Sequence, residues 1–403
     1  MYAPQGLLTK IAHETAVDAS RVSLLVSATT FGLALSVLPW AWLSDRIGRR
    51  ATMRLAAAGA AVTAVTVPWL TSFEALLAGR LLQGVALGGI PALAVALLHE
   101  TSRPSRAAGL AGSYVAATSL GGLSGRIVVT PIAEHLGWRL SLTVLGAVVV
   151  TLMGALILLL PAGDPRSAAP PPARGMVLAH LRDRRMLALF GIGGTLVGGM
   201  IAVFNYLPFR LEAPPYSLTP TVVSLIFLAY LGGTIGSHVA GRLTGRVSPS
   251  LVLVFACCLL AVGAAVTLAK PLVVIIVGVV VLTTGLFAGH AVATHLVGAR
   301  ASRGRAQASA LYTISYYTGS SVFGWLGGLA WLVAGWTGVV LLVVSLGCVA
   351  ALMTVPARRS HAPSESMCDD RKSWVRRRDS LRVLASSPIG TTRTARSVTP
   401  ASR

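Results

Sequence analysis

The sequence predicts an all-α membrane protein of about 11 full spans, arranged as two six-helix bundles related by pseudo-twofold symmetry, with the first helix truncated. Three observations predict this fold: an apolar composition, apolar stretches of spanning length, and a repeat between the two halves of the chain. Hydrophobic residues make up 54% of the 403 residues and charged residues only 12%, whereas charged residues are roughly 25% of soluble domains. The chain is therefore not a soluble globule.

Eleven stretches approach the roughly 20 apolar residues that a helix needs to cross a bilayer. Such long runs favour helices over the short alternating strands of an outer-membrane barrel. Residues 1–20 are too short and too polar for a full span and lack the features of a signal peptide, so we expect the outer end of an incomplete first helix. The predicted spans are 22–43, 54–70, 74–98, 107–133, 140–160, 187–209, 219–244, 250–269, 272–298, 306–332 and 337–355.

The basic residues alternate between rich and poor gaps along the chain. If the gap at 43–54 is cytoplasmic, the cytoplasmic gaps hold sixteen Lys or Arg and the opposite gaps hold five. The positive-inside rule then predicts that the central loop and the C-terminus face the cytosol. Attraction to anionic lipid head groups explains the net charge of +21 better than nucleic-acid binding does, so we expect no nucleic-acid partner.

A polar interval with the sequence AAPPPARG near its centre divides the chain into similar halves. We expect an N-terminal helical bundle at 1–160, a cytoplasmic central loop at 161–185, a C-terminal bundle at 186–355 and a basic disordered tail at 356–403. Three anchors repeat at offsets of 200, 199 and 198, which predicts parallel repeats. The anchor pairs are Leu43 to Gly48 with Leu243 to Ser248, Arg106 and Gly125 with Arg305 and Gly324, and Gly137-Trp138 with Gly335-Trp336.

Two motifs resemble signatures of the major facilitator superfamily. Trp42 to Arg50, WLSDRIGRR, is similar to the family signature between helices two and three, with Ala41 where glycine is usual. Arg80, Gln83 and Gly84 match the Arg-x-x-Gln-Gly signature of proton-coupled members. Thr118 stands where drug antiporters usually carry proline. The chain is most similar to the bacterial efflux-permease branch, of the YnfM and arabinose-efflux type.

The resemblance implies a secondary transporter of the bacterial cytoplasmic (inner) membrane. It would export a small organic molecule, such as a drug, sugar or metabolite, in exchange for protons by alternating access, as a monomer whose C-terminus is cytosolic. It would not be an enzyme: no catalytic residue, metal or cofactor is expected, and no Walker-type loop is present, so the proton gradient is the expected energy source. Two alternatives stay open: a proton-coupled uptake symporter, and a truncated membrane protein or sensor that transports nothing.

The resemblance also implies a cytoplasmic latch, formed by Asp45, Arg46, Gly48, Arg49 and Arg50. Asp45 could pair with arginines of its own loop or with a neighbouring helix N-terminus, where a carboxylate is favoured. In the family this contact would hold the halves together when the cavity opens outward. The alternative is a basic loop that only sets topology.

The proton-coupling candidates are Arg80, Gln83, Arg126, His238 and His290. An uncompensated cation inside a span costs about 2.5 to 3.5 kcal/mol on insertion scales, which suggests a purpose for Arg80. The alternatives are a structural Arg80 that binds backbone carbonyls, an Arg126 that snorkels, and histidines that are simply packed. None of the thirteen acids falls at mid-membrane in the predicted spans.

Polar and aromatic residues inside the spans are candidates for a substrate cavity. Tyr312 and Tyr316 are one helical turn apart with Ser315 between them. The other candidates are Gln5, Asn205 and Tyr206. Helix packing is the alternative for each of them. The four cysteines show neither metal-ligand spacing nor a disulfide framework.

Overall fold

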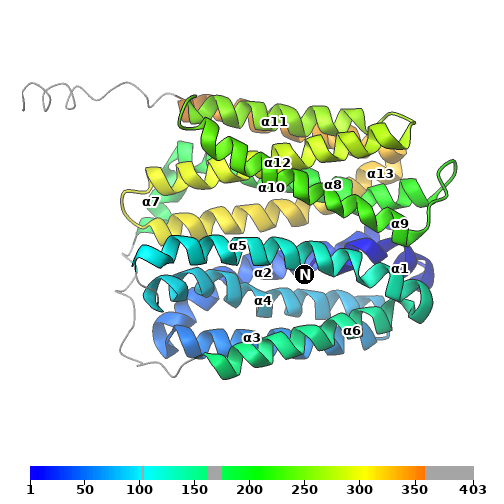
Figure 1. The fold of residues 1–403 in the computed structure, drawn as a ribbon, viewed down its shortest axis with the longest axis horizontal. Coiled ribbons are helices and arrows are strands. Elements are labelled where there is room, and N and C mark those ends of the chain that lie inside the picture. The colour runs from blue at the N-terminus through cyan, green and yellow to red at the C-terminus, as the bar shows by residue number, and fades with distance from the viewer. Residues whose placement is uncertain (102–103, 161–174, 359–403) are drawn as a thin grey trace, which may run out of the picture. The chain divides into compact units, whose positions relative to one another are not determined.

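The computed structural model describes residues 1–101, 104–160 and 175–358 of the chain. Residues Met1–Ala357 form one compact unit, and every regular element in the described ranges is a helix. Long helices lie side by side with their axes along one direction (Figure 1). Most of the predicted central loop, residues 161–174, and the tail from residue 359 lie outside the described residues.

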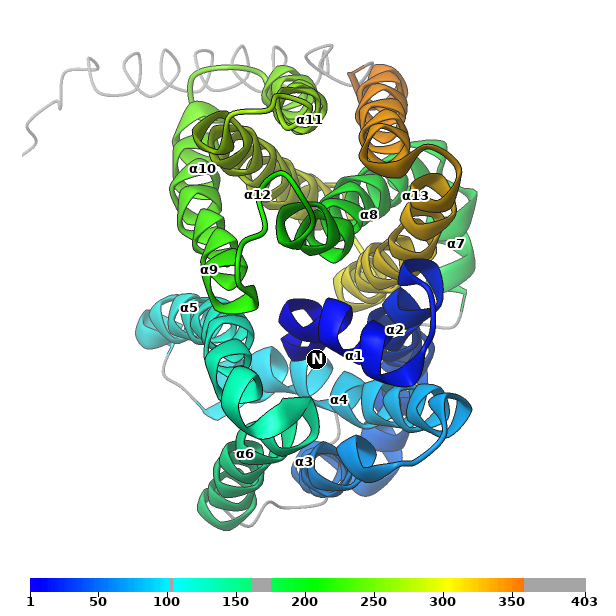
Figure 2. The same ribbon diagram turned by 90° about the vertical axis from the view of Figure 1, so that its right-hand side faces the viewer.

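The helices fall into two groups that match the two halves of the sequence (Figure 2). The first group comprises η1 (Ala3–Leu7), α1 (Leu8–Thr15), α2 (Ala19–Ile47), α3 (Arg49–Thr66), η2 (Val67–Trp69), α4 (Phe73–Thr101), α5 (Pro104–Ile127) and α6 (Val129–Leu159). After α7 (Met176–Arg182), the second comprises α8 (Arg184–Glu212), α9 (Pro220–Ser224), η3 (Leu225–Leu228), α10 (Ala229–Leu243), α11 (Pro249–Val266), α12 (Leu272–Arg300) and α13 (Arg305–Arg358). Within the first group, the short segments η1 and α1 lie on the side that faces the second group.

The predicted spans agree with the observed helices. Nine helices in the described part of the chain are long and apolar enough to cross a membrane. The last of them, α13, has 54 residues and a break in helical geometry at Ala334 and Gly335, so it contains two spans. The remaining predicted span corresponds to α5, which has 24 residues. Each predicted span is therefore matched by a helix, and the all-α fold is confirmed.

The repeated Gly-Trp pair marks the same feature in each half. Gly137 has a φ of 79° and interrupts α6, while Gly335 has a φ of 57° and interrupts α13. Glycine adopts this left-handed region without the steric cost that other residues meet. The tryptophan that follows each glycine, Trp138 or Trp336, is buried. The two halves therefore turn between their last two spans in the same way.

An arginine lies over each of these tryptophan rings. The Arg139 guanidinium carbon is 4.4 Å from the Trp138 ring centroid, and that of Arg210 is 5.5 Å from the Trp336 ring centroid. Each arginine also donates to backbone carbonyls that follow the equivalent helix of its own half, which is α3 for Arg139 and α11 for Arg210. The acceptors are Pro68 and Leu70 for Arg139, and Thr267 and Ala269 for Arg210. This contact is thus repeated in both halves, although the two arginines come from different elements.

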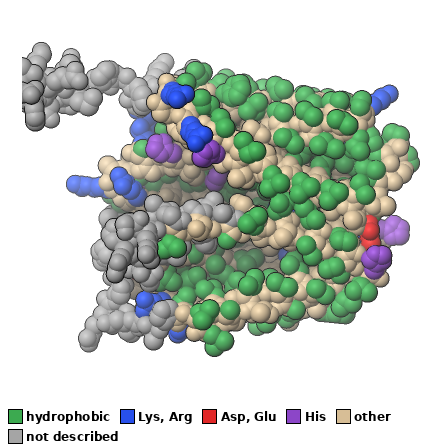
Figure 3. All heavy atoms as spheres, viewed as in Figure 1, with side chains coloured by type: hydrophobic (Ala, Val, Ile, Leu, Met, Phe, Trp, Pro, Cys, Tyr) green, Lys and Arg blue, Asp and Glu red, His purple; other side chains and the backbone are tan. Residues whose placement is uncertain are grey.

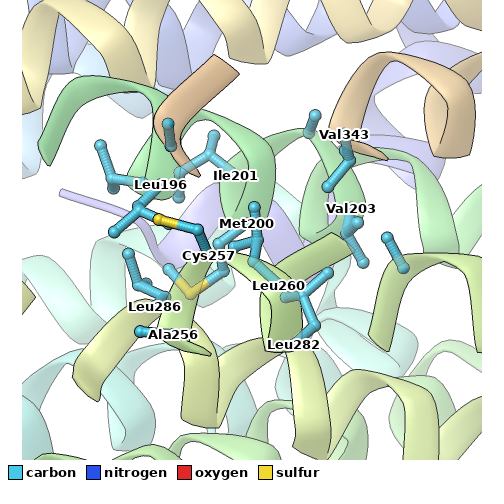
Figure 4. Packing of buried hydrophobic residues seen from close by; sticks show 14 of the residues in the cluster. Leu196, Met200, Ile201, Val203, Ala256, Cys257, Leu260, Leu282, Leu286 and Val343 are labelled. Atoms are coloured by element: carbon cyan, nitrogen blue, oxygen red, sulfur yellow. The ribbon is translucent and has the colours of Figure 1, made fainter. Parts of the chain in front are cut away.

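Helix α8 forms the centre of the second half. Of the residues in its most apolar stretch, 89% are buried, the largest share among the spans in the described ranges. Its apolar side chains pack against three neighbouring helices, as Figure 4 shows. The labelled contacts are Leu196, Met200, Ile201 and Val203 of α8 with Ala256, Cys257 and Leu260 of α11, Leu282 and Leu286 of α12, and Val343 of α13.

Glycines let α2 and α4 approach closely in the first half. A Cβ added at Gly84 would lie 2.0 Å from the Thr29 carbonyl oxygen, and one at Gly32 would lie 2.2 Å from that of Leu81. Small residues at such contacts are the usual device by which helices pack inside a membrane.

The substitution Gly84→Val should therefore lower the melting temperature of the detergent-solubilised protein, because α2 and α4 must move apart. Overpacking of this kind costs about 1 to 3 kcal/mol or more. Gly121→Val on α5 is the matched control, since a Cβ there meets no atom within 4 Å. Equal melting temperatures for the two variants would contradict the close α2–α4 contact.

Lys and Arg side chains gather mainly at one end of the helices, on the left in Figure 3. We call this end, where Arg49, Arg184 and Arg300 lie, the basic end, and the other the opposite end. At the basic end, Asp183 caps α8 by accepting from the Arg185 backbone N–H at 2.9 Å and pairs with Arg300 at 2.8 Å. Burial alone would raise the pKa of Asp183, but the hydrogen bonds and charge of Arg300 hold this pKa below its ordinary value.

Asp183→Asn should cost about 1 kcal/mol or less at neutral pH, because asparagine keeps the cap while losing the charge of a partly exposed pair. A carboxyl with a lowered folded-state pKa stabilises the fold above its unfolded pKa of about 3.9, and this contribution disappears as pH falls through the folded value. The difference in melting temperature between the wild type and this variant should therefore vanish in acid. A difference that persists below the folded-state pKa would contradict the ion pair.

Candidate functional site

Arg126, near the end of α5, is buried between the two halves. Only 1% of the residue is exposed, so it does not snorkel to the surface. Its guanidinium carbon lies 4.6 Å from the ring centroid of Tyr2, 4.9 Å from that of Tyr230 and 5.4 Å from that of Phe227. Its Nε donates to Gln5 Oε1 at 2.8 Å, and its Nη2 donates to the Tyr230 hydroxyl at 3.2 Å. Aromatic faces and neutral acceptors, rather than a carboxylate, surround this cation among the described residues.

The Arg126 guanidinium determines how two buried amides are oriented. Arginine can only donate, so Gln5 must present its Oε1 to Arg126 and its Nε2 to Asn205. That Nε2 donates to Asn205 Oδ1 at 2.8 Å, and both amides are fully buried. Asn205 Nδ2 is then a donor that has no partner among the described residues. Gln5 and Asn205 are 200 positions apart, which is the offset of the sequence repeat, so this bond joins equivalent positions of the two halves.

Hydroxyl groups on one face of α2 bind the second half. The Tyr206 hydroxyl donates to Ser23 Oγ at 2.6 Å. Ser27 and Ser321 each donate to the other's carbonyl at 2.9 Å, and the Thr30 and Ser321 hydroxyl oxygens are 2.6 Å apart. These residues of α2 occupy the part of the helix nearer the opposite end. The contact between the halves therefore extends from that end towards the middle.

Two further bonds join the halves at the opposite end itself. The Thr221 backbone N–H donates to Glu134 at 2.9 Å, and the Thr9 hydroxyl donates to Glu212 at 3.0 Å. No hydrogen bond or ion pair between described residues joins the halves at the basic end. In the described part of the chain, the polar contacts between the halves are thus confined to the opposite end and the middle.

The predicted latch lies at the basic end, between α2 and α3. Gly48 has a φ of 87° and separates the two helices. Asp45 is exposed and makes no hydrogen bond or ion pair with a described residue, whereas the Arg46 guanidinium lies 3.7 Å from the Trp42 ring centroid. Arg49 and Arg50 are half-buried. Asp45 therefore forms no hydrogen bond or ion pair with a described residue of the second half.

Arg80 is buried within α4, and its partners are mainly backbone carbonyls. Its Nε donates to the Leu25 carbonyl at 3.0 Å, and its terminal nitrogens donate to the Met1 carbonyl and to Gln83 Oε1. With Gln83 it lines a small cavity of about 70 Å³ beside Ala3. Neither a carboxylate nor a histidine contacts it among the described residues, which agrees with the alternative of a structural cation.

His290 of α12 and two tyrosines of α13 form a second polar cluster. The His290 Nδ1 is 2.9 Å from the Tyr312 hydroxyl, and the His290 ring centroid is 4.8 Å from that of Tyr316. His290 and Tyr316 are half-buried. Ser315 instead donates to the Phe190 carbonyl at 2.7 Å and so contributes to packing. The structure also separates His238 from this cluster, because that side chain is exposed on α10.

The structure thus assembles six of the predicted candidates into two clusters, Arg126 with Gln5 and Asn205, and His290 with Tyr312 and Tyr316. It also adds residues that the sequence interpretation missed. Tyr2 and Tyr230 flank Arg126, while Ser23, Ser27 and Thr30 bind the second half. The last three are spaced i, i+4 and i+7, so the helical period of polar residues within an apolar run could have identified their common face.

Comparison with known proteins places this architecture in a family. The sequence profile of the Major Facilitator Superfamily matches residues 1–288. The chain is 36% identical to the uncharacterised MFS-type transporter YybF of Bacillus subtilis, over 89% of this chain and 92% of that protein. It is 34% identical to the inner membrane transport protein YnfM of Escherichia coli, over 90% of this chain and 88% of that protein.

Solved structures show the same fold. The nucleoside transporter NupG superposes with a TM-score of 0.72 at 13% identity, over 88% of this chain and 95% of that one. The sequence matches, the spanning helices and the shared architecture lead to one conclusion. The chain belongs to the Major Facilitator Superfamily and is a multi-pass inner-membrane secondary transporter, not an enzyme.

Proposed function

We propose that the protein exports a small organic molecule in exchange for protons by alternating access, with its basic end in the cytoplasm. The observation that carries this proposal is the one-sided contact between the halves. Among the described residues, hydrogen bonds of Glu134, Gln5 and Thr30 to the second half join the halves at the opposite end and in the middle. Asp45 at the basic end has no described partner. This one-sided set of contacts supports a transporter that is closed to the outside and open to the cytoplasm.

The distribution of charge supports the orientation. The gaps at the basic end hold most of the arginines between the spans, and such gaps usually remain in the cytoplasm. In this orientation Asp45 would engage the second half only after the protein has turned outward. The latch would then be a contact of the alternate state.

His290 is the residue that we assign to the proton. Of the three histidines within the later spans, His238 and His295 are exposed, while His290 is half-buried against Tyr312 and Tyr316. Histidine changes its charge near physiological pH and is the usual choice for such a role. Arg80 and Gln83 would then support the helix packing rather than carry the proton.

Everted membrane vesicles test the direction and the coupling. Respiration acidifies the vesicle lumen, and a pH-sensitive dye follows the gradient as compounds are added. The compounds form two matched series: 4-hydroxyphenylacetate, its amide and tyramine, and indole-3-acetate, its amide and tryptamine. Alkalinisation of the lumen in vesicles that contain the protein, but not in control vesicles, supports proton exchange.

The rival function is proton-coupled uptake. It predicts no alkalinisation in everted vesicles and proton-driven accumulation of the same compound in whole cells. That pair of results would overturn export while leaving the membership of the transporter family unchanged.

A further inference from the structure

Among its described residues, the first half of the protein buries two arginines and no acid. Arg80 is 7% exposed and Arg126 is 1% exposed. Eight acids fall in the described ranges, near helix ends or in the connections, and none of the seven whose burial is described is buried. A buried charge without a counter-charge is costly, so an anion that enters this interior is stabilised there.

Both arginines retain N–H groups beyond the bonds described, but of the two Arg126 is the one that lies between the halves beside aromatic rings. Its Nη1 donates to the Gly122 carbonyl at 2.6 Å and its Nη2 to the Tyr230 hydroxyl at 3.2 Å. Each of these nitrogens carries two N–H groups, so each retains one beyond the bond described. Parallel N–H groups of this kind suit a carboxylate, which accepts two hydrogen bonds at once. Asn205 Nδ2 is a further buried donor in the same network.

Aromatic side chains surround the position where such an anion would lie. Tyr2 and Tyr230, which flank the guanidinium, are only half-buried, as is Tyr316 of the second cluster. Tyr230 also packs edge-on against Phe287, with ring centroids 5.6 Å apart. Partly exposed rings in the interior offer a surface on which a planar ring can stack. The chemistry of the site therefore fits an aromatic ring that carries a negative group.

We infer that the transported substrate is an aromatic carboxylate, and that its carboxylate pairs with Arg126 in place of the Tyr230 hydroxyl. This inference rests on the proposed function and names the substrate class of that site. Arg126 belongs to the first half and Tyr230 to the second, so the incoming anion breaks a bond between the halves. Substrate binding is thereby linked to loosening of the closed end.

An anionic substrate also has an energetic consequence. The cytoplasm is electrically negative, so the membrane potential acts on any charge that crosses the membrane. The exit of an anion and the entry of a proton move charge in the same electrical direction, so the membrane potential drives both. In everted vesicles the carboxylates should therefore move more slowly when valinomycin and potassium collapse the potential.

Binding of the two matched compound series to the purified full-length protein tests the inference. Thermal stabilisation and equilibrium dialysis should show that at least one carboxylate binds, and that its own amide and amine bind about ten- to a hundredfold more weakly. Arg126→Gln should remove this preference. Arg126→Lys should keep part of it, because the charge stays while the paired N–H groups are lost.

Arg21→Gln is the matched control. Arg21 also lies over an aromatic ring, Phe73, near the end of a span of the first half, but it is exposed and already pairs with Glu74 at 3.1 Å. This variant should retain the carboxylate preference. The inference is overturned if amides or amines bind as tightly as carboxylates, if no carboxylate binds, or if Arg126→Gln binds carboxylates like the wild type. Alkalinisation by amines alone would overturn it while leaving proton-coupled export intact, whereas carboxylate binding without proton movement would overturn only the proposed function.

Discussion

His290→Gln should abolish substrate-driven proton movement in everted vesicles, down to the level of vesicles without the protein. Glutamine keeps a polar side chain opposite the Tyr312 hydroxyl, which is 2.9 Å from His290 Nδ1, but it cannot carry a proton across the transport cycle. Within the described spans, no carboxylate lies in this cluster to take over the role. The initial rate of lumen alkalinisation is the measurement.

Two variants separate loss of the proton carrier from loss of the fold. His295→Gln, five residues further along α12, changes an exposed histidine and should keep the wild-type rate. Tyr312→Phe keeps the ring and removes only the hydroxyl, so it should alter the pH profile of the rate without abolishing transport. Full proton movement by His290→Gln would show that another group carries the proton.

The double substitution Thr30→Cys and Ser321→Cys should produce the second large effect. The hydroxyl oxygens of these residues are 2.6 Å apart across the two halves, so cysteines at these positions lie close enough to form a disulfide. Oxidation would then hold the halves together and prevent the outward-open state. We expect transport to fall to background after oxidation and to recover after reduction.

The cross-linking experiment requires a background in which the four native cysteines are replaced. Cys257 is buried among apolar side chains and is best replaced by alanine, while Cys258 and Cys348 are exposed. Each single cysteine variant should transport equally well in oxidising and reducing conditions. Undiminished transport by the fully cross-linked double variant would mean that the halves do not separate at this position.

Much of the candidate site was accessible from residue type and spacing. A cation such as Arg80 within an apolar run stands out because its burial is costly, and Tyr312 and Tyr316 share a helical face by period alone. Arg126 was harder to interpret. Its place near a helix end suggested that its side chain reaches water, and only the rings of Tyr2, Phe227 and Tyr230 show why it remains inside. Those rings come from three separate segments, so no local pattern brings them together.

The sequence by itself determined the class of the protein, its spans and its twofold repeat. Those properties follow from hydropathy over about 20 residues and from the spacing of pairs such as Gly137-Trp138 and Gly335-Trp336, which are local signals along the chain. Only the tertiary structure decided which polar residues meet: Gln5 with Asn205 and His290 with Tyr312, but not Ser315 with the tyrosines or His238 with the second cluster. Inside a membrane every polar side chain needs a partner, and which partner it finds depends on how helices distant in the sequence are rotated against each other.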